Sequence, residues 1–190
     1  MTRGFAFLVA AVTLLAGIDH ARAQGFDMRD VMGGGSFFGL GRSSSARREV
    51  VSFVSQYKPG TIFIDTAERR LYLVLPQGQA LRYGIGVGRD GFRWSGVHRI
   101  SAKKEWPSWT PPSQMLARRP DLPRHMAGGI DNPLGARTMY LGSTLYRIHG
   151  SNEPETIGQA VSSGCFRMTN EDVTDLYSRV SVGATVVVRN

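Results

Sequence analysis

The feature that most constrains the fold is a series of short β-strand patterns in the middle and at the end of the chain. Each run is rich in β-branched, aromatic or leucine side chains and is bounded by turn residues. The runs lie at residues 61–65, 70–75, 79–87, 97–102, 144–148 and 184–188. This pattern predicts a mostly β fold with one sheet system, in which the first three strands form a meander.

One helix is predicted near the C-terminus. Thr169 can cap its first turn, with Asp172 at the third position. Apolar side chains then recur at helical spacing, at Val173, Leu176, Tyr177 and Val180. Gly183 is the expected end of the helix.

Residues 1–23 have the order of features typical of a secretory signal peptide. Arg3 precedes an apolar run at residues 5–18, and the small-residue site Ala21-Arg22-Ala23 follows. The run is shorter than the about 20 apolar residues of a membrane-spanning helix. We therefore expect export to the periplasm or cell wall, with no integral membrane segment after cleavage.

Residues 24–49 are rich in glycine and serine, which predicts a flexible linker. Residues 50–190 have a length that usually makes one domain. The formal net charge of +8 favours anionic partners. Because the chain carries an export signal, we expect a cell wall with free carboxylates and no nucleic acid.

Cys165 is the only cysteine, although exported chains usually hold paired cysteines in disulfides. A buried thiol, an intermolecular bond or a catalytic thiol would each explain it. A catalytic thiol needs a nearby base, and His149, at the end of a predicted strand, can supply one. The other ring nitrogen of His149 needs an acceptor, for which the Gly150 carbonyl is a candidate.

Gly164 allows a tight turn before the cysteine, so that the N–H groups of Ser163, Gly164 and Cys165 can converge into an oxyanion hole. Each such donor is typically worth about 3 to 4 kcal/mol. Arg167 could hold a substrate carboxylate or lower the thiol pKa, and a surface ion pair is its alternative role. Ser151 is a further candidate for substrate binding.

The segments around these residues resemble the signature of L,D-transpeptidases with a YkuD-type catalytic domain. The similar segments are His149-Gly150-Ser151-Asn152, Ile157-Gly158 and Ser162 to Met168, with further similarity at residues 59–75, 86–96 and 132–141. The resemblance implies a single β-sandwich-like domain with a short helix after the nucleophile loop. It places the nucleophile on Cys165, the general base on His149 and the backbone oxyanion donors near residues 163–165. Many members have a second histidine where this chain has Ser163.

The family resemblance implies acyl transfer on peptidoglycan stem peptides. The thiolate would attack the bond between diaminopimelate and D-alanine in a tetrapeptide stem, release D-alanine and leave a thioester. The acceptor stays open, because a second stem, an anchored envelope protein or a free D-amino acid could each supply the amine. Neither a metal nor an organic cofactor is expected for this chemistry.

Two other functions remain as alternatives. A cell-wall cysteine peptidase of papain type would carry its cysteine before its histidine, which is the reverse of the order in this chain. A non-catalytic module that binds peptidoglycan through a basic groove would need neither residue.

Three other features receive a prediction. Residues 86–91 fit a G-x-G-x-x-G pattern, but no helix pattern follows, so a glycine-rich turn is expected instead of a dinucleotide site. His98 and His125 lack the close spacing of metal ligands, so no metal site is expected.

Residues 103–129, with Trp106 and Trp109, are expected to form a lid or groove wall, or else to pack against the sheet.

Overall fold

The computed structural model describes residues 48–190, so the predicted signal peptide and almost all of the predicted linker lie outside the described residues. Most elements are strands, which confirms the mostly β prediction. The strands are β1 (Glu49–Ser52), β2 (Ile62–Asp65), β3 (Arg70–Val74), β4 (Gln79–Gly84), β5 (Val87–Gly88), β6 (Gly96–Glu105), β7 (Arg137–Leu141), β8 (Arg147–His149), β9 (Ala160–Ser162), β10 (Phe166–Arg167) and β11 (Thr185–Arg189). The helices are α1 (Ser113–Arg118) and α2 (Asn170–Arg179), with a 3-10 turn at Pro154–Thr156. Neither α-helix has the length and apolar character to cross a bilayer.

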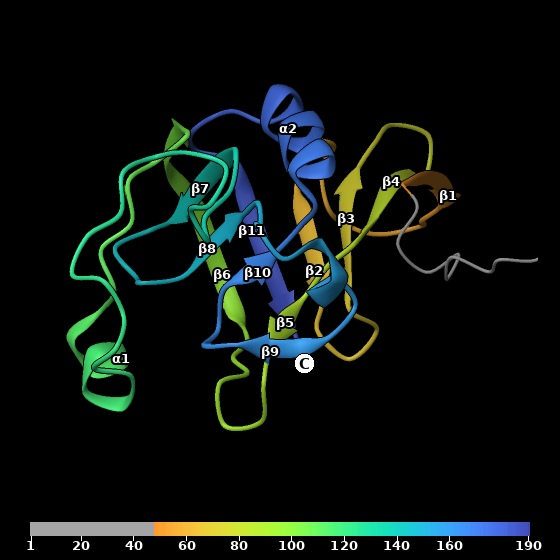
Figure 1. Ribbon diagram of the computed structural model, residues 1–190. Helices are drawn as coiled ribbons and strands as arrows, with labels where there is room; N and C mark the ends of the chain where they lie inside the picture. Colours follow the sequence, from red (N-terminus) through yellow and green to blue (C-terminus); the bar gives the residue numbers. More distant parts are fainter. Residues whose placement is uncertain (1–47) are drawn as a thin grey trace, which may run out of the picture. The chain divides into compact units, whose positions relative to one another are not determined.

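Nine of these strands form one sheet in the order β1-β4-β3-β2-β11-β6-β7-β8-β10 (Figure 1). Strands β2, β3 and β4 pair antiparallel, as the predicted meander requires. Strand β11, from the end of the chain, lies between β2, to which it is parallel, and β6, to which it is antiparallel. Strands β5 and β9 form a separate parallel pair.

Strand β6 belongs to both halves of the sheet. Its first residues pair with β11 and its later ones with β7, and the register shifts between Ile100 and Ala102. Such a bulge bends a strand and increases its twist. Both halves can therefore turn apolar side chains towards a common core, to which Ile62 of β2 and Met139 of β7 both belong.

Helix α2 covers part of this core, and Figure 1 shows it beside the upper ends of the central strands. The Thr169 side chain accepts a hydrogen bond from the Asp172 amide at 3.1 Å, which confirms the predicted cap. Val173 and Leu176 are fully buried in the core. The helix ends at Arg179, before Gly183, and the Lys103 ammonium donates to carbonyls in and just after its last turn.

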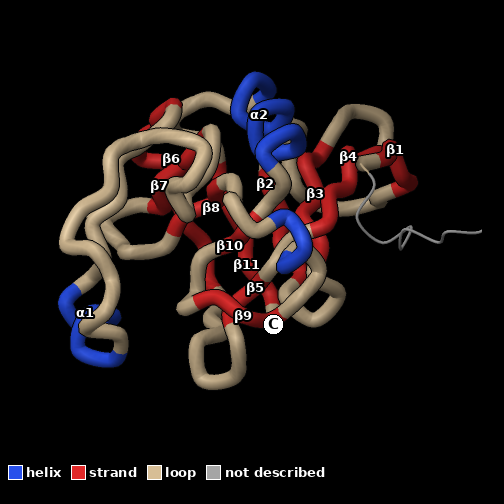
Figure 2. Tube along the Cα trace, viewed as in Figure 1, coloured by secondary structure: helices blue, strands red, loops and turns tan. Residues whose placement is uncertain are grey.

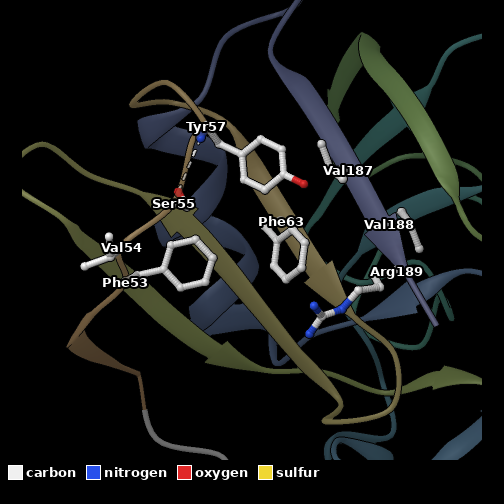
Figure 3. Close-up of a pocket in the computed structure, with 8 residues that line it drawn as sticks. All are labelled: Phe53, Val54, Ser55, Tyr57, Phe63, Val187, Val188 and Arg189. Carbon is white, nitrogen blue, oxygen red and sulfur yellow. Dashed lines mark hydrogen bonds between the residues drawn. The ribbon is translucent and has the colours of Figure 1, made fainter.

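A second apolar cluster lies on the other face of the meander. Because side chains alternate along a strand, Ile62 and Ile64 face the main core and Phe63 between them joins this second cluster with Tyr72 and Ala80. A cavity of about 440 Å³ lies beside this cluster. Figure 3 shows the Phe53, Tyr57 and Phe63 rings, which line it. Cys165 and His149 do not line this cavity.

The strand predicted at residues 144–148 is wrong in its first half, because β8 begins only at Arg147. Thr144 instead forms a turn, in which its hydroxyl donates to the Leu141 carbonyl at 2.6 Å. In the glycine-rich segment 86–91 no helix follows, as predicted, and Val87–Gly88 forms the short strand β5. Figure 2 shows the long loops on either side of α1, which occupy most of residues 106–136.

Candidate active site

The candidate nucleophile and base are brought together by two adjacent parallel strands, β8 and β10. Ile148 of β8 pairs with Phe166 of β10, and both side chains are buried in the main core. Because side chains alternate along a strand, the residues on either side of these two face away from that core. Those residues are Arg147, His149, Cys165 and Arg167.

His149 is buried and held in one orientation by the backbone. Its Nδ1 lies 2.6 Å from the Gly150 carbonyl oxygen, which confirms the predicted contact. Since a carbonyl can only accept, Nδ1 carries the proton and Nε2 keeps a lone pair. Burial lowers the pKa of His149 to about 3, with a smaller opposing contribution from the Gly150 carbonyl. The imidazole is therefore neutral near pH 7, as a general base must be.

This pKa has a consequence for stability. In the unfolded chain His149 takes up a proton near its ordinary pKa of 6.5, whereas in the folded protein it stays neutral down to about pH 3. We expect the free energy of unfolding to fall by about 1.4 kcal/mol per pH unit through this window as the pH is lowered. Urea denaturation of the wild type and of His149→Gln across the window measures it. A slope of the same size in the variant would assign the effect to another group.

Cys165 is a free cysteine that is partly exposed as a residue, and its Sγ lies 3.7 Å from the Leu145 carbonyl oxygen. Burial of the sulfur raises its pKa. The positive charge of Arg147 and hydrogen bonds from its backbone and side chain act in the opposite direction, as does the charge of Arg167. With burial dominant, the thiol is mostly protonated at neutral pH and depends on a base when it reacts.

The turn before Cys165 is closed by Ser162. Its hydroxyl donates to the Cys165 carbonyl at 2.6 Å and accepts from the Gly164 amide at 3.1 Å. The Gly164 N–H is thus already engaged, which corrects its expected place among the oxyanion donors. The N–H groups of Ser163 and Cys165 have no acceptor within residues 48–190. These two remain the candidates.

Two aromatic residues that the sequence analysis left unassigned hold this turn from outside. The Trp94 indole donates to the Gly164 carbonyl at 2.8 Å, and its ring stacks on Tyr146 with centroids 4.3 Å apart. Gly164 has φ +107°, and a Cβ there would lie 2.6 Å from Tyr146 Cε1. Only glycine therefore fits beneath Tyr146. In the sequence, Trp94 stands in a short segment between Gly91 and Gly96, which is a weak signal for this role.

The two predicted substrate-binding residues already have partners within the protein. The Arg167 guanidinium lies 3.0 Å from the Glu153 carboxylate and 3.4 Å from the Thr156 hydroxyl. The contact with Glu153 is the ion pair that the sequence offered as the alternative role of Arg167. The Ser151 side chain is buried, and its hydroxyl accepts from the Glu153 amide at 3.0 Å. Contact of either residue with a substrate stays a prediction.

Thr138 is a further residue of the site that the sequence did not reveal. It is the cross-strand partner of His149, and its buried hydroxyl has no hydrogen-bond partner among the described residues. An unpaired buried hydroxyl costs about 1 to 3 kcal/mol, so we expect Thr138→Val to raise the free energy of unfolding by about 1 kcal/mol. Urea denaturation measures the change, with Thr138→Ala as a smaller control that leaves a cavity. If Thr138→Val is less stable than the wild type, the Thr138 hydroxyl has a hydrogen-bond partner in the folded protein.

The predicted loop 103–129 begins later than expected, because its first three residues belong to β6, and the rest is ordered by hydrogen bonds. The buried Asn132 side chain donates to the Pro107 carbonyl at 3.1 Å and to the Ala127 carbonyl at 2.8 Å. Trp109 and Met126 exchange backbone hydrogen bonds of 2.8 Å in both directions. These contacts close the segment into a fixed loop.

The two tryptophans of this loop differ. Trp109 is buried, whereas Trp106 remains 43% exposed, and packing of either ring against the sheet stays a prediction. Arg118 of α1 lies over the Phe92 ring, which also carries Arg89 at 4.5 Å from its centroid. The loop thereby touches the turn after β5, whose backbone packs close to Gly164. A lid function remains a prediction.

Comparison with known proteins places most of the described chain in one family. The YkuD model, which describes the L,D-transpeptidase catalytic domain, matches residues 59–188. The probable L,D-transpeptidase YbiS of Escherichia coli strain K12 is 40% identical over 135 residues, which are 66% of this chain and 43% of YbiS. The chain thus matches less than half the length of this curated relative.

Two solved structures are also similar. One, described as a probable carnitine operon oxidoreductase from Brucella melitensis, is 50% identical with a TM-score of 0.51, covering 75% of this chain and 93% of that chain. An L,D-transpeptidase from Mycobacterium smegmatis is 16% identical with a TM-score of 0.55, covering 68% and 58%. At 16% identity, the similarity to the Mycobacterium smegmatis structure concerns the fold alone. The name of the Brucella protein refers to an activity other than that of the YkuD model and YbiS.

Proposed function

We propose that this chain, which belongs to the YkuD family of L,D-transpeptidase catalytic domains, is a peptidoglycan L,D-transpeptidase with Cys165 as nucleophile and His149 as base. The observation that carries the proposal is the pairing of β8 with β10. In this pairing Cys165 and His149 flank the partners Phe166 and Ile148, and Nδ1 of His149 contacts the Gly150 carbonyl. Nε2 is then free to accept the thiol proton.

The first half-reaction forms a thioester. The sulfur bonds to the carbonyl carbon between diaminopimelate and D-alanine in a tetrapeptide stem while its proton moves to Nε2 of His149. The bond to the D-alanine nitrogen then breaks, and His149 returns the proton to this leaving amine. Because the thiol pKa is raised and the His149 pKa is lowered, proton transfer accompanies the attack and does not precede it.

The second half-reaction resolves the thioester. An acceptor amine attacks the same carbonyl carbon, the carbon–sulfur bond breaks, and the amine proton returns to sulfur through His149. The Ser163 and Cys165 amides are the donors for the oxyanion in both steps. The acceptor is a second stem in a 3-3 cross-link, an anchored envelope protein, or a free D-amino acid.

The proposed place of action is the periplasm or cell wall. Its support is the signal-like pattern at residues 1–23. The net charge of +8 suits a substrate with free carboxylates.

The test is mass spectrometry of the full chain incubated with purified tetrapeptide muropeptides. We expect release of D-alanine and a tripeptide thioester on Cys165. Cross-linked dimers, or exchange of an added D-amino acid, would identify the acceptor. If neither D-alanine release nor an adduct on Cys165 appears, with stem peptides or with a carbapenem, the transpeptidase proposal fails.

A further inference from the structure

Three neighbouring strands place a row of side chains beside the candidate nucleophile. Tyr140 of β7 is the cross-strand partner of Arg147 of β8. The pairing of Phe166 with Ile148 then sets Cys165, one position earlier in the chain, next to Arg147. Arg147 therefore lies between an aromatic ring and the thiol.

The Arg147 guanidinium is held in this row. It lies over the Tyr140 ring, 5.4 Å from the ring centroid, an attractive cation–π distance. Its Nε is buried and has no hydrogen-bond partner within residues 48–190. The only other such buried side-chain atom in this part of the chain is Thr138 Oγ1, beside His149. The two buried groups without a hydrogen-bond partner therefore belong to residues next to the candidate pair: Arg147 is next to Cys165, and Thr138 is next to His149.

An arginine in this position has no internal counter-ion to neutralise it. The ion pairs of the described chain include Arg167 with Glu153 and Arg137 with Glu105, whereas none involves Arg147. Its full charge therefore acts on its surroundings, of which the Cys165 sulfur is the group that can become negative.

We propose that Arg147 is a positioning residue for the reaction, whose fixed positive charge stabilises the Cys165 thiolate as it forms. This inference rests on the proposed function only in taking Cys165 as the nucleophile. In many thiol enzymes a protonated histidine supplies the positive charge. His149 cannot do so while it is neutral, whereas an arginine side chain carries a permanent positive charge.

The charge also decides how the proton moves. As the thiol proton moves to Nε2 of His149 during the attack, negative charge develops on sulfur beside Arg147. As the sulfur bonds to the substrate carbonyl, this charge moves to the carbonyl oxygen, and it returns to sulfur when the thioester is resolved. Arg147 favours the anion on sulfur, but it also disfavours a long-lived imidazolium, because its charge lowers the pKa of His149.

The experiment measures the pH dependence of Cys165 alkylation by iodoacetamide, which needs no peptidoglycan. An opposite charge within about 4 to 6 Å lowers a pKa by 1 to 3 units, so we expect Arg147→Met to slow alkylation at pH 7 at least about tenfold. Arg147→Lys should restore most of the rate because it keeps the charge. Arg70→Met, on β3, is the control arginine and should alkylate like the wild type. An unshifted pH profile in a folded Arg147→Met protein overturns the proposal.

A measurement on the wild type covers the case in which Arg147→Met does not fold. A fixed cation beside the sulfur favours the anionic reagent iodoacetate over neutral iodoacetamide, relative to a free cysteine. We expect the ratio of the two rates to exceed that of free cysteine and to fall with added salt. A ratio equal to or below that of free cysteine also overturns the proposal. Absence of D-alanine release with these alkylation results intact would reject only the transpeptidase function.

Discussion

Replacing Cys165 with alanine is expected to reduce D-alanine release from a tetrapeptide stem by at least about 10⁴-fold. Removing the nucleophile of a covalent mechanism leaves only binding and oxyanion stabilisation, and losses of this size or larger follow in such enzymes. The variant should fold normally, since Cys165 is partly exposed and lies outside the main core. The measurement is the rate of D-alanine release, with thermal unfolding as the check on folding.

Ser163→Ala is the matched control, since it changes a neighbouring side chain that makes no hydrogen bond to another described residue. It should keep near wild-type activity, because the candidate oxyanion donor at this position is the backbone N–H and not the side chain. Binding of Cys165→Ala to wall fragments separates an enzyme from a binding module. An alanine variant that retains full activity would remove Cys165 from the mechanism.

Gly164→Ala is expected to lower activity at least about 100-fold and stability by about 3 kcal/mol. The new Cβ would meet Tyr146 Cε1 at 2.6 Å, and that ring is confined by its stack on Trp94. The turn must then move, and with it Cys165. Displacement of a reacting group by about 1 Å can cost 10²-fold in rate, and overpacking with an unfavourable φ accounts for the stability loss.

The Gly183→Ala variant separates the effect of backbone strain from that of the steric contact with Tyr146. Gly183 has φ +93°, similar to Gly164, but a Cβ there meets nothing within 4 Å. It should therefore lose only the about 1 to 2 kcal/mol of the backbone strain and keep its activity. Equal losses of activity in the two variants would show that the Tyr146 contact is not the cause.

Local features of the site could be predicted from the sequence, and contacts across strands could not. The Gly150 acceptor for His149 is its chain neighbour, and the Thr169 cap follows a short-range pattern. Thr138 and Arg147 acquire their places from strand register, which periodicity does not reveal. The engaged Gly164 amide escaped prediction for a related reason, because the Ser162 hydroxyl competes for it.

Prediction of the strands from the sequence was limited in the same way, by contacts between distant parts of the chain. The meander was predictable because each strand pairs with its neighbour in the chain. The two-residue strands β5 and β10 pair with β9 and β8, which are not their immediate neighbours in the chain, and both are too short to show any alternation. Their partners are the reason they form.

The central position of β11 affects how this chain can fold. The sheet halves meet through β11 and β6, so the order β2-β11-β6 cannot be completed until the last segment of the domain is in place. Contacts between segments so distant in sequence make folding slow, because the loop must close before the pairing stabilises it. The two halves of the sheet can therefore join only after β11 has been synthesised.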